Sequence, residues 1–428
     1  MHILYVARRF SPDVKGGGEI SALNIAKTMV IRGHDVQVLT TREDGPGSYQ
    51  INGVKVNYIP FDGRFRKRFT GEFYEDAVLN FKLYREMRNN MDLSQIDIIH
   101  ALNMSTLPAV AMIGMHHSPP TIATVNSSWL MCFTYDQLTL EKEVCTFCSW
   151  TRLMQCSLFK GRDVNFGRRG LRALRGLYGI AVMRCRRFFA DRMPILITVS
   201  RFMKRQLISF GYDPRRIIVI NDPLDLQRLD TERVTEIQRQ LNLGDDDVSV
   251  ILYAGRLVPE KGVQFLVRAM NTVVKRLPNA HLLLVGRGYY KKRLRDISRR
   301  LNIHQNVHFI GFVDHYTVLH YIKLADVCVS PTIIGEPLGL FLAEGAIYGK
   351  PLIATYVGNN PENVRSGYNG LIIPPRDHKV LASALIKILT SQAKLSLTDA
   401  QQEIQKKFSS QKVTSKYLKL YNFLIDRV

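Results

Sequence analysis

The sequence contains no long apolar run, and it has few acidic residues for its size. No run reaches the roughly 18–20 apolar residues that a membrane-spanning helix needs. Met1–Ala7 predicts a strand and lacks the basic and apolar regions of a signal peptide. We therefore expect a cytoplasmic protein. A length of 428 residues favours two or more domains, because single cores rarely exceed about 250–300 residues.

The shortage of acidic residues leaves the chain strongly basic. It has 59 lysine and arginine residues against 37 aspartate and glutamate residues, a net charge of +22. Residues 151–220 hold 16 of the basic residues and 3 of the acidic ones, and a smaller basic run lies at residues 64–68. Such an excess points to an anionic partner, which is a membrane surface, a nucleic acid or a phosphorylated substrate. A solvated basic face with no specific partner is the alternative.

The six cysteines are unevenly placed. Cys185 and Cys328 lie in apolar runs and are expected to be buried. The other four fall within 25 residues and include one C-x2-C pair: Cys132, Cys145, Cys148 and Cys156. A cytoplasmic setting disfavours disulfides, so these thiols are candidate ligands of a structural zinc or another thiophilic metal. Thiols packed in an insertion without a metal are the alternative.

The first half of the chain alternates strand and helix signals. Strands are expected at residues 2–7, 35–39, 54–59, 96–100, 121–125, 195–199 and 217–220. Between the first strand and the helix that follows lie Gly16, Gly17 and Gly18. Three glycines before a helix can cradle a phosphate with backbone N–H groups, although a flexible turn is the alternative. The order G-G-G-E does not match G-x-G-x-x-G, which disfavours a dinucleotide-dependent oxidoreductase.

A basic helix is expected over residues 170–192. Its apolar side is predicted to carry Leu171, Leu174, Tyr178, Ala181 and Cys185. Such a helix can lie on anionic lipid. A helix that covers the sheet and turns its arginines to solvent is an equally good interpretation.

A second alternating series begins at Ser249. Strands are expected at 250–254, 281–285, 307–310, 327–330, 352–355 and 371–373, with helices at 263–275, 291–301, 316–324, 338–348 and 380–389. Strands that alternate with helices predict parallel sheets. The fold class is therefore α/β, with two Rossmann-like domains at residues 1–222 and 223–408. Residues 409–428 follow as a helix with one apolar face.

One stretch, residues 335–351, combines a helix with two acids. Glu336 and Glu344 stand eight positions apart, and Pro337 suits the first turn of a helix that continues to Tyr348. The free N–H groups at a helix N-terminus favour an anion such as phosphate. Acids beside that end can accept hydrogen bonds from hydroxyl groups of the same ligand. An ordinary helix with one capping acid and one solvated acid is the alternative.

Other polar residues are expected at the same edge of the second sheet. Gly255 and Arg256 follow its first strand, and Lys261 comes shortly after. Gly286 follows the second strand, and Phe312 with Val313 the third. Ligands of open parallel sheets bind beyond the carboxyl ends of the strands, and an arginine with a lysine there can hold a diphosphate.

These motifs resemble the retaining GT-B glycosyltransferases of family 4. The likeness runs nearly end to end and is most specific in Y-A-G-R-L-V-P-E-K-G, E-P-L-G-L-F-L-A-E-G and G-K-P-L-I-A-T. F-S-P-D-V-K-G-G-G-E, D-I-I-H-A and V-S-R-F-M-K carry a looser match in the first half. The resemblance implies two Rossmann-like domains with a cleft between them. It also implies a final helix that crosses back to the first domain.

The resemblance further implies transfer of a sugar from a nucleotide diphosphate sugar, with retention at the anomeric carbon and no catalytic metal. Arg256 and Lys261 would bind the diphosphate, Glu336 hydroxyls of the donor sugar and Glu344 those of the ribose. Donor contacts are further implied at Gly17, Gly18, Gly255, Gly286, Phe312, Val313, Gly339 and Leu340. The implied acceptor is a glycan or a lipid-linked molecule. Together with the basic stretch, this predicts a peripheral protein on the inner membrane face, with nucleic acid a less favoured partner.

The sequence departs from the family at one site position. Many relatives place a histidine after the strand at 121–125, where this chain has Asn126. Asparagine is neither a cation nor a general base near neutral pH, so activation of the acceptor through this residue is in doubt. A subset of relatives carries cysteines after this strand, and residues 126–165 resemble that insertion. A degenerate relative that only binds membrane or nucleic acid is the alternative, although the basic and acidic residues of the second domain disfavour it. A GT-B phosphorylase ranks lower still.

Overall fold

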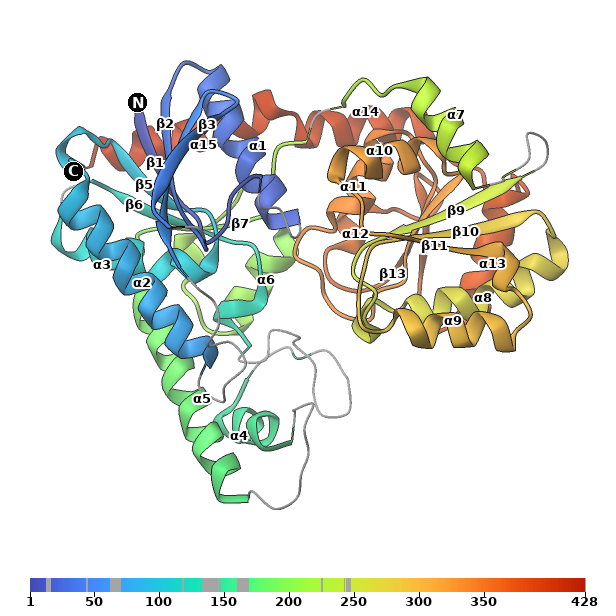
Figure 1. Cartoon of the computed structure of the whole chain (residues 1–428), viewed down its shortest axis with the longest axis horizontal. Coiled ribbons are helices and arrows are strands. Elements are labelled where there is room, and N and C mark those ends of the chain that lie inside the picture. Colours follow the sequence, from blue (N-terminus) through green and yellow to red (C-terminus); the bar gives the residue numbers. More distant parts are fainter. Residues whose placement is uncertain are drawn as a thin grey trace. The chain divides into compact units, whose positions relative to one another are not determined.

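The chain folds into two α/β units. The computed structural model describes residues 1–12, 17–43, 45–61, 71–117, 119–132, 145, 148–159, 169–224, 226–241, 243 and 248–427, so the basic run at 64–68 lies outside the described residues. The first unit comprises Met1–Pro223 with Ser409–Val428, and the second comprises Leu224–Phe408 (Figure 1). Each unit is considered by itself below.

An eight-stranded sheet forms the centre of the first unit. Its strands are β1 (His2–Val6), β2 (Asp35–Arg42), β3 (Gly47–Ile51), β4 (Val54–Pro60), β5 (Ile98–Ala101), β6 (Thr121–Val125), β7 (Leu196–Thr198) and β8 (Ile217–Val219). They lie in the order β3-β4-β2-β1-β5-β6-β7-β8, and all pairs are parallel except β3 with β4. The inner strands are apolar runs buried on both faces, which is typical of a parallel sheet covered by helices.

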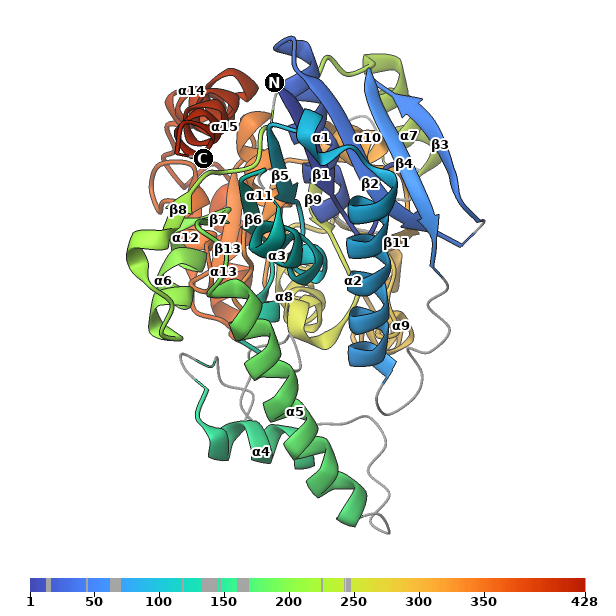
Figure 2. The ribbon, with the colours of Figure 1, turned by 90° about the vertical axis from the view of Figure 1, so that its left-hand side faces the viewer.

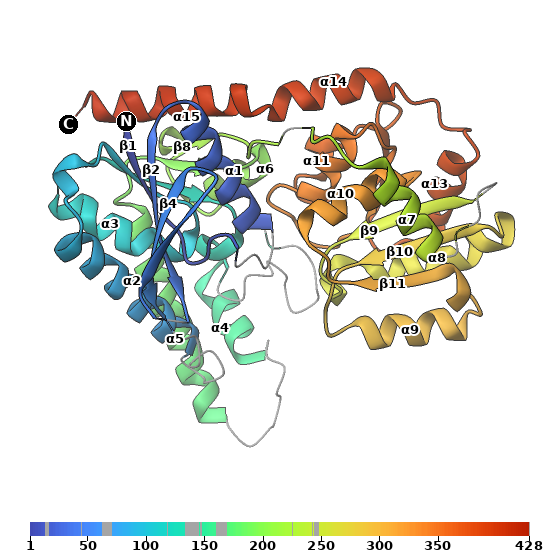
Figure 3. The ribbon, with the colours of Figure 1, turned by 45° about the horizontal axis from the view of Figure 1, so that its top comes forward.

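Helices cover both faces of this sheet. The helices of this unit are α1 (Gly17–Ile31), α2 (Gly71–Asn90), α3 (Leu107–His116), α4 (Trp150–Phe159), α5 (Arg169–Ala190), α6 (Arg201–Ser209) and α15 (Ser410–Ile425), of which α4 packs against α5. α1 and α15 share one apolar core with the face that carries Ile3 and Tyr5 (Figure 3). α2, α3 and α5 lie together on the opposite side (Figure 2).

A buried histidine ties the C-terminal helix to this sheet. His100 on β5 is fully buried, and its Nδ1 lies 2.7 Å from the hydroxyl of Tyr421 on α15. Its Nε2 lies 2.7 Å from Oγ1 of Thr124 on β6. Burial lowers the pKa of His100 to about 3, so the imidazole is neutral at physiological pH. The histidine of the D-I-I-H-A motif therefore has a structural role within this unit.

The orientation of α5 differs from the expected one. Ala181 was assigned to the apolar side, but it is exposed, and Cys185 is only partly buried. The buried side instead carries Val182 and Arg186, because the guanidinium of Arg186 stacks 4.2 Å from the ring of Trp129 and donates to that residue's carbonyl at 3.0 Å. Because the buried arginine packs on this aromatic ring, the buried side of α5 is not the purely apolar side that the sequence predicts.

A six-stranded parallel sheet forms the centre of the second unit. Its strands are β9 (Ser249–Ala254), β10 (Ala280–Val285), β11 (Val307–Gly311), β12 (Val327–Ser330), β13 (Leu352–Thr355) and β14 (Gly370–Ile373). They lie in the order β11-β10-β9-β12-β13-β14. The order reverses beside β9, so β9 and β12 are neighbours and their carboxyl ends flank the switch point where ligands of such sheets bind.

Helices also cover both faces of the second sheet. They are α7 (Thr231–Gln240), α8 (Val263–Arg276), α9 (Lys291–Arg300), α10 (His315–Leu324), α11 (Leu340–Ile347), α12 (Asn360–Asn363), α13 (His378–Leu389) and α14 (Leu397–Phe408). α8, α9 and α13 enclose the main apolar core with the sheet, and α10 and α11 lie on the other side (Figures 1 and 3). Two Rossmann-like units with parallel sheets confirm the predicted fold class.

The helix of the 335–351 stretch begins later than expected. Pro337 was expected in its first turn, but α11 starts at Leu340, with Gly339 as the N-cap residue. Gly339 has φ 65° and ψ 51°, a left-handed conformation that favours glycine and breaks the helix on its N-terminal side. Glu336 therefore lies in an ordered loop, and Glu344 lies little more than one turn into the helix.

No helix in the part of the chain that the structure describes is long and apolar enough to cross a membrane.

Candidate active site

Two loops of the second unit meet where β9 and β12 end. The first is the turn η6 (Pro259–Lys261), which closes on Gly262 with φ 69°. A Cβ on Gly262 would lie 1.8 Å from the carbonyl oxygen of Pro331, so only glycine lets this turn approach the end of β12. The N–H of Ile333 donates to the carbonyl of Glu260 at 3.0 Å and joins the two loops. The fold therefore holds Lys261 against the segment that leads to Glu336.

The joined loops bring opposite charges together. Nζ of Lys261 lies 2.9 Å from Oε1 of Glu336, with only 15% and 21% of the two side chains exposed. The hydroxyl of Tyr253, at the end of β9, donates to the carbonyl of Arg256 at 2.9 Å. Burial raises the pKa of Tyr253 well above its usual value, and the charge of Glu336 adds to that rise. Tyr253 is thus a neutral donor that fixes the backbone from which the exposed Arg256 extends.

The second acid, Glu344, is held by a histidine that sequence reasoning missed. Glu344 is 5% exposed, and its Oε1 lies 2.5 Å from Nε2 of His315 at the start of α10. Burial lowers the pKa of His315, but the hydrogen bond and charge of Glu344 outweigh it and leave the pKa raised. The raised pKa favours the protonated imidazole beside Glu344. The adjacent segment F-V-D-H was the only sequence signal for this residue.

The remaining predicted positions of the second unit lie at strand ends. Gly255 (φ 156°) and Gly286 (φ 131°) follow β9 and β10, and a Cβ on Gly286 would lie 2.0 Å from the carbonyl oxygen of Gly255. Phe312 follows β11, is 54% exposed, and stacks 4.6 Å from the guanidinium of Arg287. With Val313 beside it, Phe312 offers a flat apolar surface at the carboxyl edge of the sheet.

The predicted residues of the first unit also form a group of their own. Gly17 and Gly18 lie in the first turn of α1, and Asn126 follows β6. A Cβ on Gly18 would lie 3.6 Å from Nδ2 of Asn126, which donates to the carbonyl of Leu102 at 3.3 Å. Two of the three segments follow strands at the carboxyl edge, so the first sheet also gathers its candidate polar groups at one edge.

The four clustered cysteines lie outside these groups. Cys132 follows the turn η4 (Ser128–Leu130), Cys145 and Cys148 precede α4, and Cys156 lies within it. Burial, followed by the charges of Cys132, Cys156 and Cys145, raises the pKa of the Cys148 thiol to about 11. Within the described ranges, however, no three histidine, cysteine or acidic residues are arranged to hold a metal ion.

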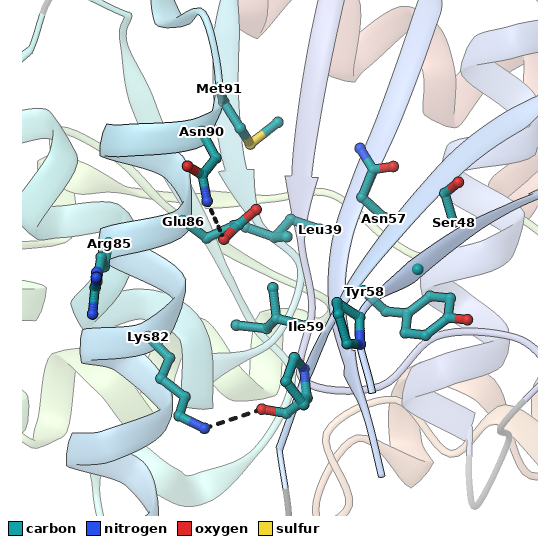
Figure 4. A pocket seen from close by; sticks show the side chains of 13 residues that line it. Leu39, Ser48, Asn57, Tyr58, Ile59, Lys82, Arg85, Glu86, Asn90 and Met91 are labelled. Atoms are coloured by element: carbon teal, nitrogen blue, oxygen red, sulfur yellow. Dashed lines mark hydrogen bonds between the residues drawn. The ribbon is translucent and has the colours of Figure 1, made fainter. Parts of the chain in front are cut away.

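One further pocket, of about 680 Å³, lies in the first unit (Figure 4). It is bounded by β4 and α2, with Leu39 and Ile59 at its apolar floor and Lys82, Glu86 and Asn90 on the helix side. Lys82 donates to the carbonyl of Pro60 at 3.2 Å across it. None of the residues predicted as site residues lines it.

Family comparisons assign both halves of the chain. Residues 15–228 match the model of Glycosyltransferase Family 4, and residues 234–408 match the model of Glycosyl transferases group 1. The chain belongs to the group 1 glycosyltransferases. Its family membership confirms the resemblance to group 1 glycosyltransferases that the motifs indicate. The fold pairs the motif residues Lys261 and Glu336, and it pairs Glu344 with His315.

Individual relatives agree with this assignment. An uncharacterized glycosyltransferase of Methanocaldococcus jannaschii is 24% identical, over 100% of this chain and 99% of the relative. A GDP-mannose-dependent alpha-(1-6)-phosphatidylinositol monomannoside mannosyltransferase of Mycobacterium tuberculosis is 31% identical over 47% of this chain and 54% of the relative. The crystal structure of Anabaena Alr3699/HepE in complex with UDP-glucose covers 99% of both chains with a TM-score of 0.69 and 18% identity. This structural likeness supports the GT-B fold of the glycosyltransferase.

Proposed function

We propose that this glycosyltransferase moves a sugar from a nucleotide diphosphate sugar to an acceptor, with retention of configuration. The observation that carries the proposal is the pairing of Lys261 with Glu336 beside the mouth of α11, at the carboxyl edge of the second sheet. A cation, a helix N-terminus and two acids at one switch point suit a ligand that joins a diphosphate to hydroxyl-rich sugars. The UDP-glucose named for HepE and the GDP-mannose named for the mannosyltransferase belong to this class.

Within this proposal each residue has a distinct role. Arg256 and Lys261 bind the diphosphate and offset the negative charge that grows on it as it leaves, so that no metal ion is needed. Glu336 accepts hydrogen bonds from the donor sugar, and Glu344 from the ribose. Phe312 offers its exposed face to the base. Four of these side chains are already held: Lys261 and Glu336 by each other, Glu344 by His315, and Phe312 by the guanidinium of Arg287.

The proposed transfer step needs no general base from Asn126. Asn126 cannot take a proton, and its amide already donates to a backbone carbonyl. The proposed step is therefore a front-face displacement. The bond from the anomeric carbon to the diphosphate oxygen breaks while a bond to the acceptor oxygen forms on the same face. The acceptor proton passes to the departing diphosphate oxygen.

The proposed acceptor is lipid-linked or otherwise anionic, at the cytoplasmic face of a membrane. The exposed side of α5 carries the stripe Leu177, Ala181, Arg184 and Phe188, and the exposed Arg192 follows in the turn after the helix. Leu177 and Phe188 are 60% and 46% exposed. Apolar side chains that alternate with arginine suit the boundary between lipid headgroups and acyl chains.

A thermal-shift panel of nucleotide sugars followed by a transfer assay tests the function. We expect one nucleotide diphosphate sugar to raise the melting temperature, since a ligand that binds only the folded state stabilises it. The protein should release the corresponding nucleoside diphosphate when an acceptor is added. If no nucleotide sugar binds, and Lys261→Ala and Glu336→Ala change no activity, the chain is a binding protein and the proposal is wrong.

A further inference from the structure

Three buried asparagines lie beneath the mouth of α11. Asn359, Asn360 and Asn363 follow β13 and are 1%, 0% and 2% exposed. Nδ2 of Asn359 donates to the carbonyl of Leu338 at 2.5 Å, and Nδ2 of Asn363 donates to the same oxygen at 2.7 Å. We call these three side chains the amide platform. One backbone carbonyl that accepts two buried amide groups is held in a fixed orientation.

That carbonyl belongs to the residue before the helix N-cap. Gly339 has no side chain with which to cap α11, so the amide platform fixes the peptide that leads into the helix. Two backbone contacts connect the segment after β13 to Glu336. The N–H of Asn359 donates to the carbonyl of Glu336 at 3.2 Å, and a Cβ on Gly358 would lie 2.4 Å from the backbone nitrogen of Glu336. The segment after β13 therefore holds the loop from Glu336 to Gly339 in place from one side.

The amide platform is itself anchored to the sheet. Asn360 donates from Nδ2 to the carbonyl of Thr355 at the end of β13, at 3.0 Å. Thr355 in turn donates from Oγ1 to the carbonyl of Thr332 after β12, at 2.6 Å. Asn369 donates to the carbonyl of Asn363 at 2.8 Å. The position of Glu336 is thus linked through short bonds to two strands of the core.

The side-chain oxygens of the three asparagines argue against a purely stabilising role. The Oδ1 atoms of Asn359, Asn360 and Asn363 are buried and have no hydrogen-bond partner among the residues that the structure describes. Two of them, in Asn359 and Asn360, lie 3.1 and 3.6 Å from the place that a Cβ on Gly339 would occupy. Buried polar atoms are rarely left unpaired, because each loses its bonds to water. Departures of this kind concentrate at functional sites.

We propose that the amide platform positions Glu336 and the first turn of α11 for the sugar part of the donor. The inference rests on the proposed function. Asn359, Asn360 and Asn363 are positioning residues, because they act through Leu338 and Gly339 and are themselves buried. The diphosphate and the ribose are assigned to the side chains of Lys261 and Glu344, which pair with Glu336 and His315 rather than with the amide platform. Loss of the platform should therefore affect the sugar more than the nucleotide.

The test compares two asparagine-to-aspartate variants. Asn363→Asp keeps the shape but replaces the donating NH2 with an oxygen that repels the Leu338 carbonyl. Asn306→Asp is the matched control, because Asn306 also donates to backbone carbonyls, those of Pro278 and Ala280 at 3.0 and 3.1 Å, at the opposite edge of the sheet. We expect Asn363→Asp to lower kcat/KM for the nucleotide sugar by about 10- to 100-fold, mainly in kcat, as displaced catalytic geometry does. Affinity for the nucleoside diphosphate alone should change by less than about threefold, and Asn306→Asp should change neither value.

Asn359→Asp provides a second variant if Asn363→Asp does not fold. The proposal is overturned if the variants lose stability like Asn306→Asp but retain the wild-type kcat/KM. Failure of the proposed function is distinguishable, because it would appear in the wild type as an absence of turnover. In that case amide hydrogen exchange decides: the N–H groups of residues 338–341 should exchange faster in Asn363→Asp than in Asn306→Asp. Equal exchange would overturn the positioning role.

Discussion

Nζ of Lys261 and Oε1 of Glu336 lie 2.9 Å apart and are largely shielded from solvent. Each is assigned to a different part of the donor, the lysine to the diphosphate and the glutamate to the sugar. When no donor is bound, the side chains of Lys261 and Glu336 form an ion pair with each other. A bound diphosphate must therefore compete with Glu336 for the lysine, while the sugar hydroxyls give the carboxylate new partners.

This competition predicts opposite effects of the two substitutions on nucleotide binding. Glu336→Ala frees Lys261, so affinity for the nucleoside diphosphate should stay equal or rise while sugar transfer falls by about 100-fold or more. Lys261→Ala should weaken nucleoside diphosphate binding by about 10- to 100-fold. Titration calorimetry and steady-state kinetics measure both. Lys55→Ala, which breaks an exposed pair with Asp35 in the first unit, is the control and should change neither. Weaker nucleotide binding by Glu336→Ala would contradict the assignment.

The bond between His315 and Glu344 predicts a pH-dependent contribution to stability. The pKa of His315 is raised in the folded protein, so the contribution is fully present below the unfolded value of about 6.5 and is lost as pH rises through the folded pKa. His315→Gln should therefore destabilise the protein more at pH 6 than at pH 9, as measured by urea unfolding. His308→Gln is a control of opposite sign. Burial and then the charge of His281 lower the pKa of His308, so its stabilising contribution is lost as pH falls. An equal effect of His315→Gln at both pH values would count against the ionic pair.

The exposed stripe on α5 predicts binding to anionic vesicles. Arg184 and Phe188 are one helical turn apart and exposed. The double variant Arg184→Glu/Phe188→Asp should weaken binding to phosphatidylserine-containing vesicles by about tenfold or more, since each basic residue near such a surface contributes about 1 kcal/mol. Lys419→Glu/Phe423→Asp on α15 makes the same change at the same spacing and should bind like the wild type. Vesicle sedimentation at low and high salt measures the effect. Equal binding by the two double variants would exclude α5 as the membrane contact.

The four cysteines that fall within 25 residues of sequence predict about one equivalent of zinc or another thiophilic metal in protein purified without chelator. Four thiolates bind zinc tetrahedrally, so Cys132, Cys145, Cys148 and Cys156 would supply a complete set of ligands. Cys145→Ser/Cys148→Ser should lose the metal and melt at a lower temperature. Cys185→Ser should retain it. Elemental analysis that finds less than about half an equivalent in the wild type would remove the site.

Local patterns in the sequence predicted most of the fold and the charged residues of the candidate site. β12 and β13 match their predicted bounds, because each is a short apolar run with a proline at one end, a pattern typical of buried strands. β3 was missed, since Gly47–Ile51 is a mostly exposed edge strand without an apolar signal. Glu336, Glu344 and Lys261 were recognised from their motifs.

The partners of these residues depend on the tertiary fold. His315 meets Glu344 across 29 positions, and Asn363 meets Leu338 across 25. The start of α11 depends on the left-handed conformation of Gly339. The sequence did not reveal this start, because Pro337 favours a helix that begins earlier. The order of the strands in the sheet decides which loops meet, and therefore which contacts of this kind form. The hydrophobic periodicity and the composition of the sequence contain no information about these contacts.

A buried acid in the first unit predicts that stability falls as pH rises. Asp222 is 4% exposed and accepts a hydrogen bond from Ser21 Oγ at 2.5 Å. Burial raises its pKa to about 6, although the bond from Ser21 opposes the rise. Between the unfolded value of about 3.9 and the folded pKa, the unfolded chain has lost the proton that the folded chain retains. Ionisation of Asp222 therefore lowers the free energy of unfolding at neutral pH, by about 3 kcal/mol for a pKa that rises from about 3.9 in the unfolded chain to about 6 in the folded protein.

Asp222→Asn removes this cost and keeps an oxygen for Ser21. We expect the variant to be more stable than the wild type at pH 7.5 and to differ little near pH 4, where Asp222 is largely protonated in the folded protein. Urea unfolding at both pH values gives the comparison. Ser21→Ala is the counterpart, because it removes a hydrogen bond that favours the carboxylate and should destabilise the protein most at pH 7.5. A loss of stability in Asp222→Asn at pH 7.5 would mean that the ionised carboxylate is stabilised by its surroundings, contrary to its burial.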